Sequence, residues 1–145
     1  MINIKQIPAI QTYPVRHPVL RPGKPIETCA FAGDDLETTI HFGAFINDEI
    51  AGCISVFYAG NEVFNLDKQY QLRGMAVLEQ YQKKGLGELL INKAEEFIKN
   101  KQGKLIWFNA RENAVNFYKK MGYKITNQPF TIPDVGIHYI ISKHL

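Results

Sequence analysis

The sequence predicts one α+β domain, in which a sheet with a single parallel crossover packs against helices. Three observations lead to this prediction. An apolar stretch at residues 70–78 enters a glycine-rich loop, and an amphipathic stretch leaves that loop. A continuous apolar run at residues 104–109 follows, and a strand, helix, strand order implies a parallel strand pair. The remaining strand-like runs are separated by turn residues.

Length and composition set the scale of the protein. At 145 residues the chain is predicted to form one domain, residues 1–145, because it can bury one core but is short for two. Hydrophobic residues make up 46% and charged residues 21% of the chain, which is typical of a globular protein and not of a disordered one. The net charge of +3 comes without a long basic run, so no nucleic acid is expected as a partner.

Targeting, membrane and metal-binding signals are not evident in the sequence. The first eight residues lack the hydrophobic core of a signal peptide, and no apolar run approaches the length of a membrane span. We therefore expect a cytoplasmic protein without a membrane partner. Cys29 and Cys53 lack the spacing of metal ligands and the four histidines are scattered, so no metal is predicted.

The N-terminal segment begins with a strand and then becomes irregular. Apolar and polar residues alternate over residues 1–7, which predicts a half-buried strand. Residues 8–20 are expected to form one or two short helices interrupted at Pro14 and Pro18. The prolines and glycine of residues 21–25 exclude regular structure there.

The charged residues of this region are interpreted as facing solvent. Its basic side chains could pair with an acidic group, but a solvated connection is the preferred interpretation. They are Arg16, His17, Arg21 and Lys24. Asp34 and Asp35 lie in a polar stretch and predict a hydrated turn. The alternative is an acid/base pair, which would require the turn to bring the two adjacent carboxylates together.

A hairpin and a buried strand come next. Residues 38–46 and 50–58 are rich in β-branched and aromatic residues and flank a turn sequence at 47–49, which predicts a hairpin. A polar loop at 59–69 leads into the strand at 70–78.

The loop at residues 82–87 joins that strand to the N-terminus of a helix. Backbone N–H groups in a first helical turn lack internal partners and carry the positive end of the helix dipole, so this junction can hold a phosphate. Gly85 and Gly87 allow a ligand to approach the backbone, and the preceding lysine pair adds positive charge. An ordinary connection is the alternative. Nucleotide motifs fit poorly, because no Lys-Ser/Thr follows the last glycine and Leu90 occupies the place of a third one.

The helix after the loop is well specified. Glu88 in its first turn and Lys99 in its last complement the helix dipole, and Gly103 is a natural stop. The apolar face of this helix must pack on the sheet. The run at 104–109 is then a strand buried on both sides, and therefore central.

The C-terminal part contains a shorter helix and two strands. The helix is predicted at residues 114–121, with Gly122 as its stop. Strands at 123–126 and 136–142 flank a proline-containing loop at 128–134.

Two motifs of the chain resemble those of a known family. Gln82-Lys83-Lys84-Gly85-Leu86-Gly87, with Val77 five residues before Gln82, matches the pattern Gln/Arg-x-x-Gly-x-Gly/Ala. Asn113-Ala114-x-x-Phe117-Tyr118-x-x-Met121-Gly122-Tyr123 is similar to Asn-x-x-Ala-x-x-Phe-Tyr-x-x-x-Gly-Phe/Tyr, with one residue fewer between Asn and Ala. The motifs occur in the right order with a helix and a strand between them. Residues 70–126 thereby resemble the GNAT N-acetyltransferases, and in detail a bacterial branch of that family.

The resemblance implies a mixed sheet that is splayed at its centre, with acetyl-CoA as cosubstrate between the fourth and fifth strands. Pantetheine amides would pair with the strand backbone at Met75 and Val77, and the pyrophosphate with N–H groups of the loop. The residues that the resemblance assigns to cofactor contacts are Met75, Ala76, Val77, Gln82, Lys83, Lys84, Gly85, Leu86, Gly87, Glu88, Asn109, Asn113 and Phe117. For Asn113, a helix N-cap is an equal alternative.

Catalysis in this family is direct attack of an amine on the thioester. A strand N–H near Val77 would polarise the thioester oxygen, and Tyr118 matches the family's tyrosine that protonates the leaving thiolate. The alternative for Tyr118 is a core aromatic with a satisfied hydroxyl. For the base that takes the amine proton, a water chain is the default, and Glu79, His41 and His138 are candidates.

The sequence indicates least about the acceptor substrate and the pocket that binds it. Arg73 stands where several family members carry a base, and it would suit a carboxylate or phosphate on the acceptor. The candidate substrate-binding residues are Arg73, His41 and His138, in a pocket formed by residues 14–25, the hairpin and residues 128–138. The function predicted is transfer of an acetyl group to a primary amine of a small molecule or peptide. A non-catalytic CoA-binding sensor is the alternative, and the resemblance leaves a homodimer open.

Overall fold

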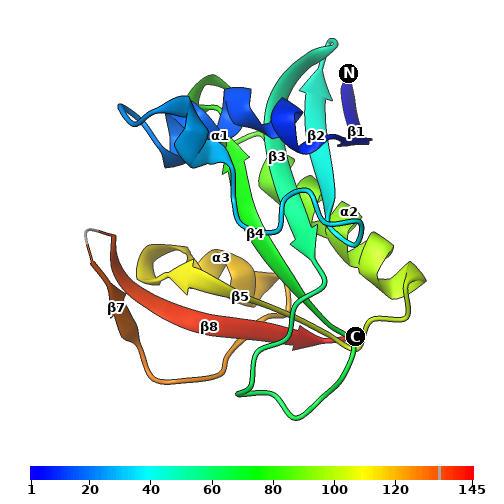
Figure 1. Cartoon of the computed structure of the whole chain (residues 1–145), viewed down its shortest axis with the longest axis vertical. Helices are drawn as coiled ribbons and strands as arrows, with labels where there is room; N and C mark the ends of the chain where they lie inside the picture. The colour runs from blue at the N-terminus through cyan, green and yellow to red at the C-terminus, as the bar shows by residue number, and fades with distance from the viewer. Residues whose placement is uncertain (134) are drawn as a thin grey trace.

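A computed structural model describes residues 1–133 and 135–145 and contains a mixed sheet flanked by helices (Figure 1). The strands are β1 (Ile2–Ile7), β2 (Ile40–Ile46), β3 (Glu49–Phe57), β4 (Gln69–Val77), β5 (Leu105–Arg111), β6 (Lys124–Ile125), β7 (Phe130–Ile132) and β8 (Gly136–His144). The helices are α1 (Tyr13–Leu20), α2 (Leu86–Asn100) and α3 (Val115–Lys120). The sheet order is β1-β2-β3-β4-β5-β8-β6, with β7 also pairing with β8. The predicted α+β class is confirmed.

The centre of the sheet is splayed. β4 and β5 form the one parallel pair among the described strands, and they pair only where residues 69–71 meet residues 105–107. Beyond Gln71 and Trp107 the two strands diverge, so each presents an edge that the other does not cover (Figure 1). The predicted parallel crossover and the splayed centre are therefore both present.

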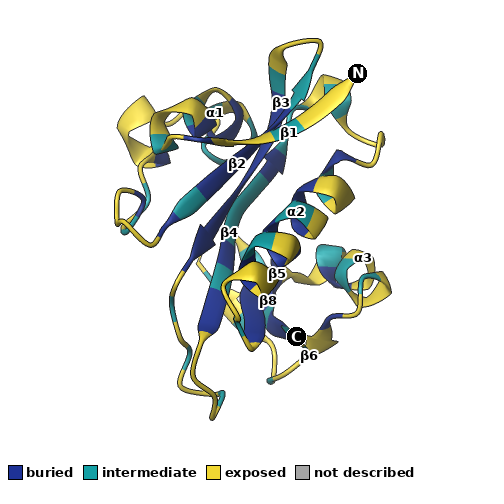
Figure 2. Ribbon diagram, turned by 90° about the vertical axis from the view of Figure 1, so that its right-hand side faces the viewer, coloured by how far each residue is buried: buried dark blue, intermediate teal, exposed yellow. Residues whose placement is uncertain are grey.

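Two helices cover opposite faces of the sheet (Figure 2). The amphipathic face of α2 buries Leu90, Ile91 and Ala94 in the main core, together with apolar residues of β3 such as Ile54. On the other face, Val15 of α1 packs in a smaller cluster with side chains of β3 and β4. The two faces of β4 are thus served by different parts of the chain.

A bulge in β4 sets which side chains face each helix. The register with β3 shifts here, so that Gly74 and Met75 together lie opposite Ile54. Gly74 has a φ of +65°, a left-handed conformation that favours glycine. After the bulge Met75 joins the α2 side, whereas Arg73, before it, lies on the α1 side against the ring of Phe31.

The hairpin is formed as predicted, and its turn is tight. Asn47 and Asp48 both have positive φ, at 49° and 70°, as a two-residue type I′ turn requires. Asn and Asp tolerate this conformation better than other non-glycine residues do, which explains their place between the strands.

The prediction for residues 8–20 was wrong in one respect, because neither proline interrupts the helix. A 3₁₀ turn (η1, Ala9–Thr12) leads directly into α1. Pro14 lies in the first turn of α1, where its missing N–H has no intrahelical partner to lose. Pro18 lies inside α1 and removes one hydrogen bond, which the packing of this helix against β3 and β4 tolerates.

The C-terminal loop prediction was also incomplete. Residues 130–132 of the predicted loop form β7, which pairs with residues 136–138 of β8. Position 134 of that loop lies outside the described residues. The second helix begins as a 3₁₀ turn (η4, Glu112–Ala114) before α3.

None of the helices in the described parts of the chain combines the length and apolar character needed to cross a membrane.

Candidate active site

The divergence of β4 and β5 opens a cleft of about 390 Å³. Its walls are residues 71–75 of β4 and residues 108–111 of β5. Tyr118 of α3, His138 of β8 and Arg21 complete the lining that concerns the chemistry. Because each strand edge here lacks a neighbouring strand, backbone hydrogen-bonding groups face the cleft together with these side chains.

The glycine-rich loop ends at the N-terminus of α2. Lys83 and Gly85 both adopt left-handed conformations, with φ of 64° and 82°, and Gly85 is the N-cap of α2. Consecutive N–H groups in such a turn form a concave donor set, which the first turn of α2 extends. Gln82 through Gly85 and Glu88 are exposed, whereas Leu86 is buried and fixes the start of the helix to the core.

Three predicted cofactor residues meet where the loop approaches β4 and α3. A Cβ atom placed on Gly87 would lie 3.6 Å from Cε of Met75 and 3.7 Å from Cζ of Phe117. The side chain of Gln82 reaches back to β4, where its Nε2 donates a hydrogen bond of 3.0 Å to the carbonyl of Val77. The loop, β4 and α3 are therefore joined at one end of the cleft.

The strand backbone supports part of the predicted pairing. The N–H of Leu78 donates to Ala51 of β3 at 2.8 Å. Since hydrogen-bonding groups alternate sides along a strand, those of Met75 and Val77 face the open edge and those of Ala76 face β3. The side chain of Ala76 is also buried, on the α1 side. Ala76 is thus not brought together with the other predicted contacts.

Tyr118 lines the cleft beside the aromatic core. Its ring packs edge-on against Phe108 and Phe117, at centroid distances of 4.7 and 5.1 Å. Burial raises the pKa of the Tyr118 hydroxyl to about 12, so it keeps its proton at neutral pH. No described residue hydrogen-bonds to this hydroxyl, which leaves its proton free for a ligand.

The two asparagines differ in position. Asn109 lines the cleft from β5 and is exposed. Asn113 lies in η4, outside the cleft lining, and the N-cap of α3 is Ala114 without a side-chain hydrogen bond. The helix-cap alternative for Asn113 is therefore not what the structure has.

Of the three candidate bases, His138 is the one that the structure places at the cleft among the described residues. Its Nδ1 lies 2.9 Å from the carbonyl oxygen of Gly136. A carbonyl only accepts, so Nδ1 carries the proton and the neutral ring keeps a lone pair on Nε2. Glu79 is exposed in a 3₁₀ turn (η3, Glu79–Tyr81) and does not line the cleft.

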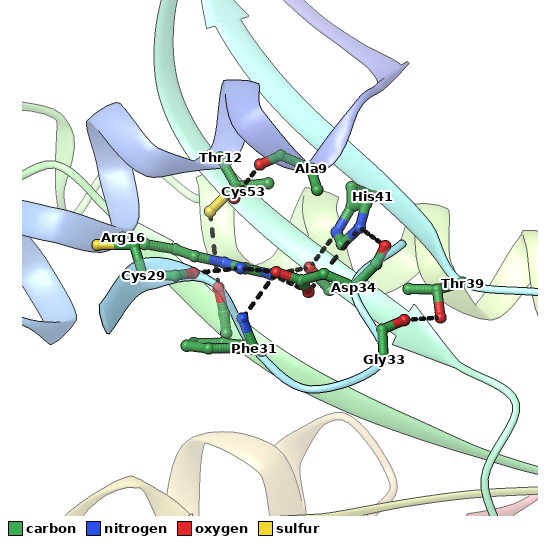
Figure 3. Close-up of polar contacts among 12 residues, drawn as sticks. Ala9, Thr12, Arg16, Cys29, Phe31, Gly33, Asp34, Thr39, His41 and Cys53 are labelled. Carbon is green, nitrogen blue, oxygen red and sulfur yellow. Dashed lines mark hydrogen bonds and ion pairs between the residues drawn. The ribbon is translucent and has the colours of Figure 1, made fainter. Parts of the chain in front are cut away.

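His41 belongs instead to a buried polar network on the α1 face (Figure 3). Its Nδ1 lies 2.6 Å from Oγ of Ser55 and its Nε2 lies 3.0 Å from the carbonyl of Asp34. Both ring nitrogens are occupied and the side chain is buried, so His41 does not reach the cleft.

Arg16 is the centre of this network, which the sequence interpretation missed. Its guanidinium forms a bidentate pair with Asp34, at 2.6 and 3.1 Å, and also donates to the carbonyl of Cys29 and to Ser55 (Figure 3). Both charged side chains are buried, so the predicted solvated connection and hydrated turn are wrong for Arg16 and Asp34. Thr12, Val15 and Arg16 are all buried and are spaced as residues on one face of a helix. This spacing is the sequence feature that could have indicated the burial of Arg16.

The charge state of Asp34 follows from these contacts. Burial alone would raise the pKa of its carboxyl group, but the hydrogen bonds from Arg16 and from the N–H of Phe31, with the Arg16 charge, outweigh burial. The pKa therefore lies below its ordinary value of 3.8, and Asp34 is ionised at neutral pH.

Comparisons with known proteins agree with this architecture. The model of the Acetyltransferase (GNAT) family matches residues 9–123. The Bacillus subtilis (strain 168) protein YitI, named an uncharacterized N-acetyltransferase, is 34% identical over 145 residues, which cover 100% of this chain and 97% of YitI.

Two solved structures share the fold. The ribosomal-protein-S18-alanine N-acetyltransferase of Escherichia coli has a TM-score of 0.78 at 17% identity, covering 99% of this chain and 94% of that one. A GNAT family acetyltransferase of Elizabethkingia anophelis with acetyl-CoA bound has a TM-score of 0.71 at 19% identity, covering 99% and 98%. The splayed sheet, the two motifs and the family match lead to one conclusion: this chain is an acyltransferase that belongs to the GNAT family.

Proposed function

We propose that this protein transfers the acetyl group of acetyl-CoA to a primary amine of a small molecule or peptide, by direct attack of the amine on the thioester. The observation that carries the proposal is the cleft between β4 and β5, which has an open strand edge and is lined by a protonated tyrosine and by Met75, beside which α2 begins. The structure of a family member with acetyl-CoA bound supports the choice of cosubstrate.

The chain offers matching groups for each part of acetyl-CoA. The exposed backbone at Met75 and Val77 can hydrogen-bond the pantetheine amides as a neighbouring strand would. The N–H groups of residues 83–88 and the positive end of α2 can hold the pyrophosphate, and Lys83 and Lys84 add charge. The absence of a side chain at Gly87, beside Met75 and Phe117, allows the ligand to approach the loop closely.

The transfer has three steps. The amine nitrogen bonds to the acetyl carbon, and the developing oxyanion takes a backbone N–H near Val77. Nε2 of His138 accepts the proton that the amine nitrogen releases. The carbon–sulfur bond breaks, and the thiolate takes the proton of the Tyr118 hydroxyl.

The first experiment follows free-thiol release from acetyl-CoA with a panel of amines and peptides, with acetyl-CoA binding measured by calorimetry on the same sample. We expect binding, and thiol release with one class of amine. Binding without release from any amine would favour a CoA-binding sensor, and no binding would exclude the proposal.

The variant Gly87→Val tests the cofactor site. A Cβ on Gly87 fits at ordinary contact distance, but the added γ-methyl groups fill the space beside Met75 and Phe117 that the ligand needs. We expect acetyl-CoA affinity to fall about tenfold or more, since close backbone approach is lost. Unchanged acetyl-CoA affinity in Gly87→Val would show that the loop does not bind the cofactor. Lys101→Gln, at the far end of α2, is the control and should bind normally.

The variant His138→Gln tests the base. We expect kcat/KM for the amine to fall by about 10²-fold, because general-base catalysis contributes this much, while acetyl-CoA affinity is kept. His144→Gln is the matched control, since His144 lies exposed on the same strand outside the cleft. A loss below threefold for His138→Gln would leave proton removal to a water chain.

A further inference from the structure

Positive charge gathers on the α1 side of the cleft around one aromatic ring. The guanidinium carbons of Arg16, Arg73 and Arg21 lie 3.9, 4.9 and 5.4 Å from the ring centroid of Phe31. Arg73 also lies 5.1 Å from the ring of Phe57. The rings hold these planar side chains by cation–π contact, so the group has a defined arrangement.

One carboxylate in this region is already used. Asp34 accepts both forks of Arg16 and the N–H of Phe31, at 2.6 to 3.1 Å. Arg16 is thereby neutralised and fully buried, which leaves Arg21 and Arg73 without an acidic partner among the described residues. The described residues that line the cleft include Arg21, Arg73 and Arg111 and no Asp or Glu.

This arrangement is unfavourable for the protein alone. Burial lowers the pKa of Arg73 from its ordinary value, and the positive charges of Arg16 and Arg21 act in the same direction against the opposing charge of Asp34. Like charges held together in a partly desolvated cleft are stabilised when an anion binds between them. The fork of an arginine matches the paired oxygens of a carboxylate or phosphate.

The phosphates of acetyl-CoA are assigned to another place. The loop of residues 82–87 and the N-terminus of α2 meet Met75 and Phe117, on the face of β4 that α2 covers. Arg73 lies on the opposite side of the Gly74 bulge, on the face that α1 covers. A Cβ on Gly74 would come within 2.9 Å of the Phe31 ring, so the close approach of this ring to β4 requires glycine.

We infer that the acceptor amine carries an anionic oxygen group, a carboxylate or a phosphate, which Arg21 and Arg73 bind beside Phe31. The inference rests on the proposed function and names its substrate class. The anionic group sits on the α1 side, and the amine reaches the cleft between β4 and β5, where Tyr118 and His138 lie.

The test uses pairs of amines that differ in the anionic group alone: 4-aminobutyrate with butylamine, an amino acid with its amide, and O-phosphoethanolamine with ethanolamine. Thiol release should give a kcat/KM about tenfold or more higher for an anionic member than for its neutral partner, as charge-assisted hydrogen bonds imply. The carboxylate and phosphate pairs show which anion the site takes.

The variants Arg73→Gln and Arg21→Gln should each reduce this preference, mainly through KM, by about tenfold or more. Acetyl-CoA affinity should stay at the parent value. Lys124→Gln, which removes one positive charge from an exposed strand outside the cleft, is the control and should keep the preference.

Failure of the inference and failure of the proposed function give different results. Absence of acetyl-CoA binding in the calorimeter excludes the proposed function. Calorimetric titration of the protein with the same amine pairs compares the binding affinities of the anionic and neutral members, whether or not thiol is released. Equal binding of both members, or a preference unchanged in Arg73→Gln, overturns the inference. So does a variant that loses acetyl-CoA affinity while keeping acceptor preference, because the arginines would then serve the cofactor.

Discussion

Replacing Tyr118 with Phe is expected to lower kcat by about 100-fold or more, because the leaving thiolate loses its proton donor. The ring contacts with Phe108 and Phe117 remain, so folding and acetyl-CoA affinity should be kept. Since burial raises the pKa of Tyr118 to about 12, the hydroxyl stays protonated across the assay range. The factor lost should therefore be the same from about pH 6 to about pH 10.

The measurement is thiol release at saturating acetyl-CoA, beside calorimetry of acetyl-CoA binding. Tyr58→Phe, at an exposed ring outside the cleft lining, serves as the control. A reduction below threefold in Tyr118→Phe would take the tyrosine out of the mechanism.

The variant Asp34→Ala is expected to lower the free energy of unfolding by about 3–5 kcal/mol, because it leaves the charge of Arg16 buried and unpaired. That is a large part of the stability of an ordinary domain, about 5–15 kcal/mol. Urea denaturation, analysed with a shared slope, measures the difference. A change below about 1 kcal/mol would mean that water reaches Arg16.

Two comparisons separate charge from packing. Asp67→Ala removes a carboxylate whose pair with Lys104 is exposed, and it should leave the unfolding midpoint unchanged. The double variant Arg16→Met with Asp34→Leu should recover much of the lost stability, since apolar residues can replace a buried ion pair.

The pH dependence of the free energy of unfolding also tests the contribution of the Asp34 carboxylate. The pKa of Asp34 is lowered on folding, so its contribution is complete above its ordinary value of 3.8 and is lost as pH falls through the lowered folded value. The parent should lose this contribution below about pH 4, and Asp34→Ala should lack it.

Features set by neighbouring residues could be predicted from the sequence. The loop of residues 82–87 and the helix after it depend on glycine, terminal charges and helical periodicity, all of which are local. The hairpin depends on Asn47 and Asp48. The central strand depends on its own apolar run, and the structure agrees in each case.

Features set by distant residues could not be predicted in the same way. The ion pair between Arg16 and Asp34 joins positions 18 residues apart. Because Pro14 and Pro18 were expected to interrupt the helix, its buried face, which includes Arg16, was not predicted. The strand at Phe130–Ile132 is too short to show periodicity and exists because β8 pairs with it. The divergence of β4 and β5 was predicted from the family resemblance alone. The apolar sequence of a strand does not show whether the neighbouring strand stays paired with it along its whole length.

The opposed helices have an evolutionary consequence. The α1 face, with Arg21 and Phe31, is built by the first quarter of the chain, whereas the loop and α2, which we propose to bind acetyl-CoA, are built by its middle. Within β4, the bulge at Gly74 separates side chains that serve the two sides. Mutations in the first quarter of the chain can therefore change the acceptor side of the cleft without altering the proposed cofactor residues, all of which lie at or after Met75.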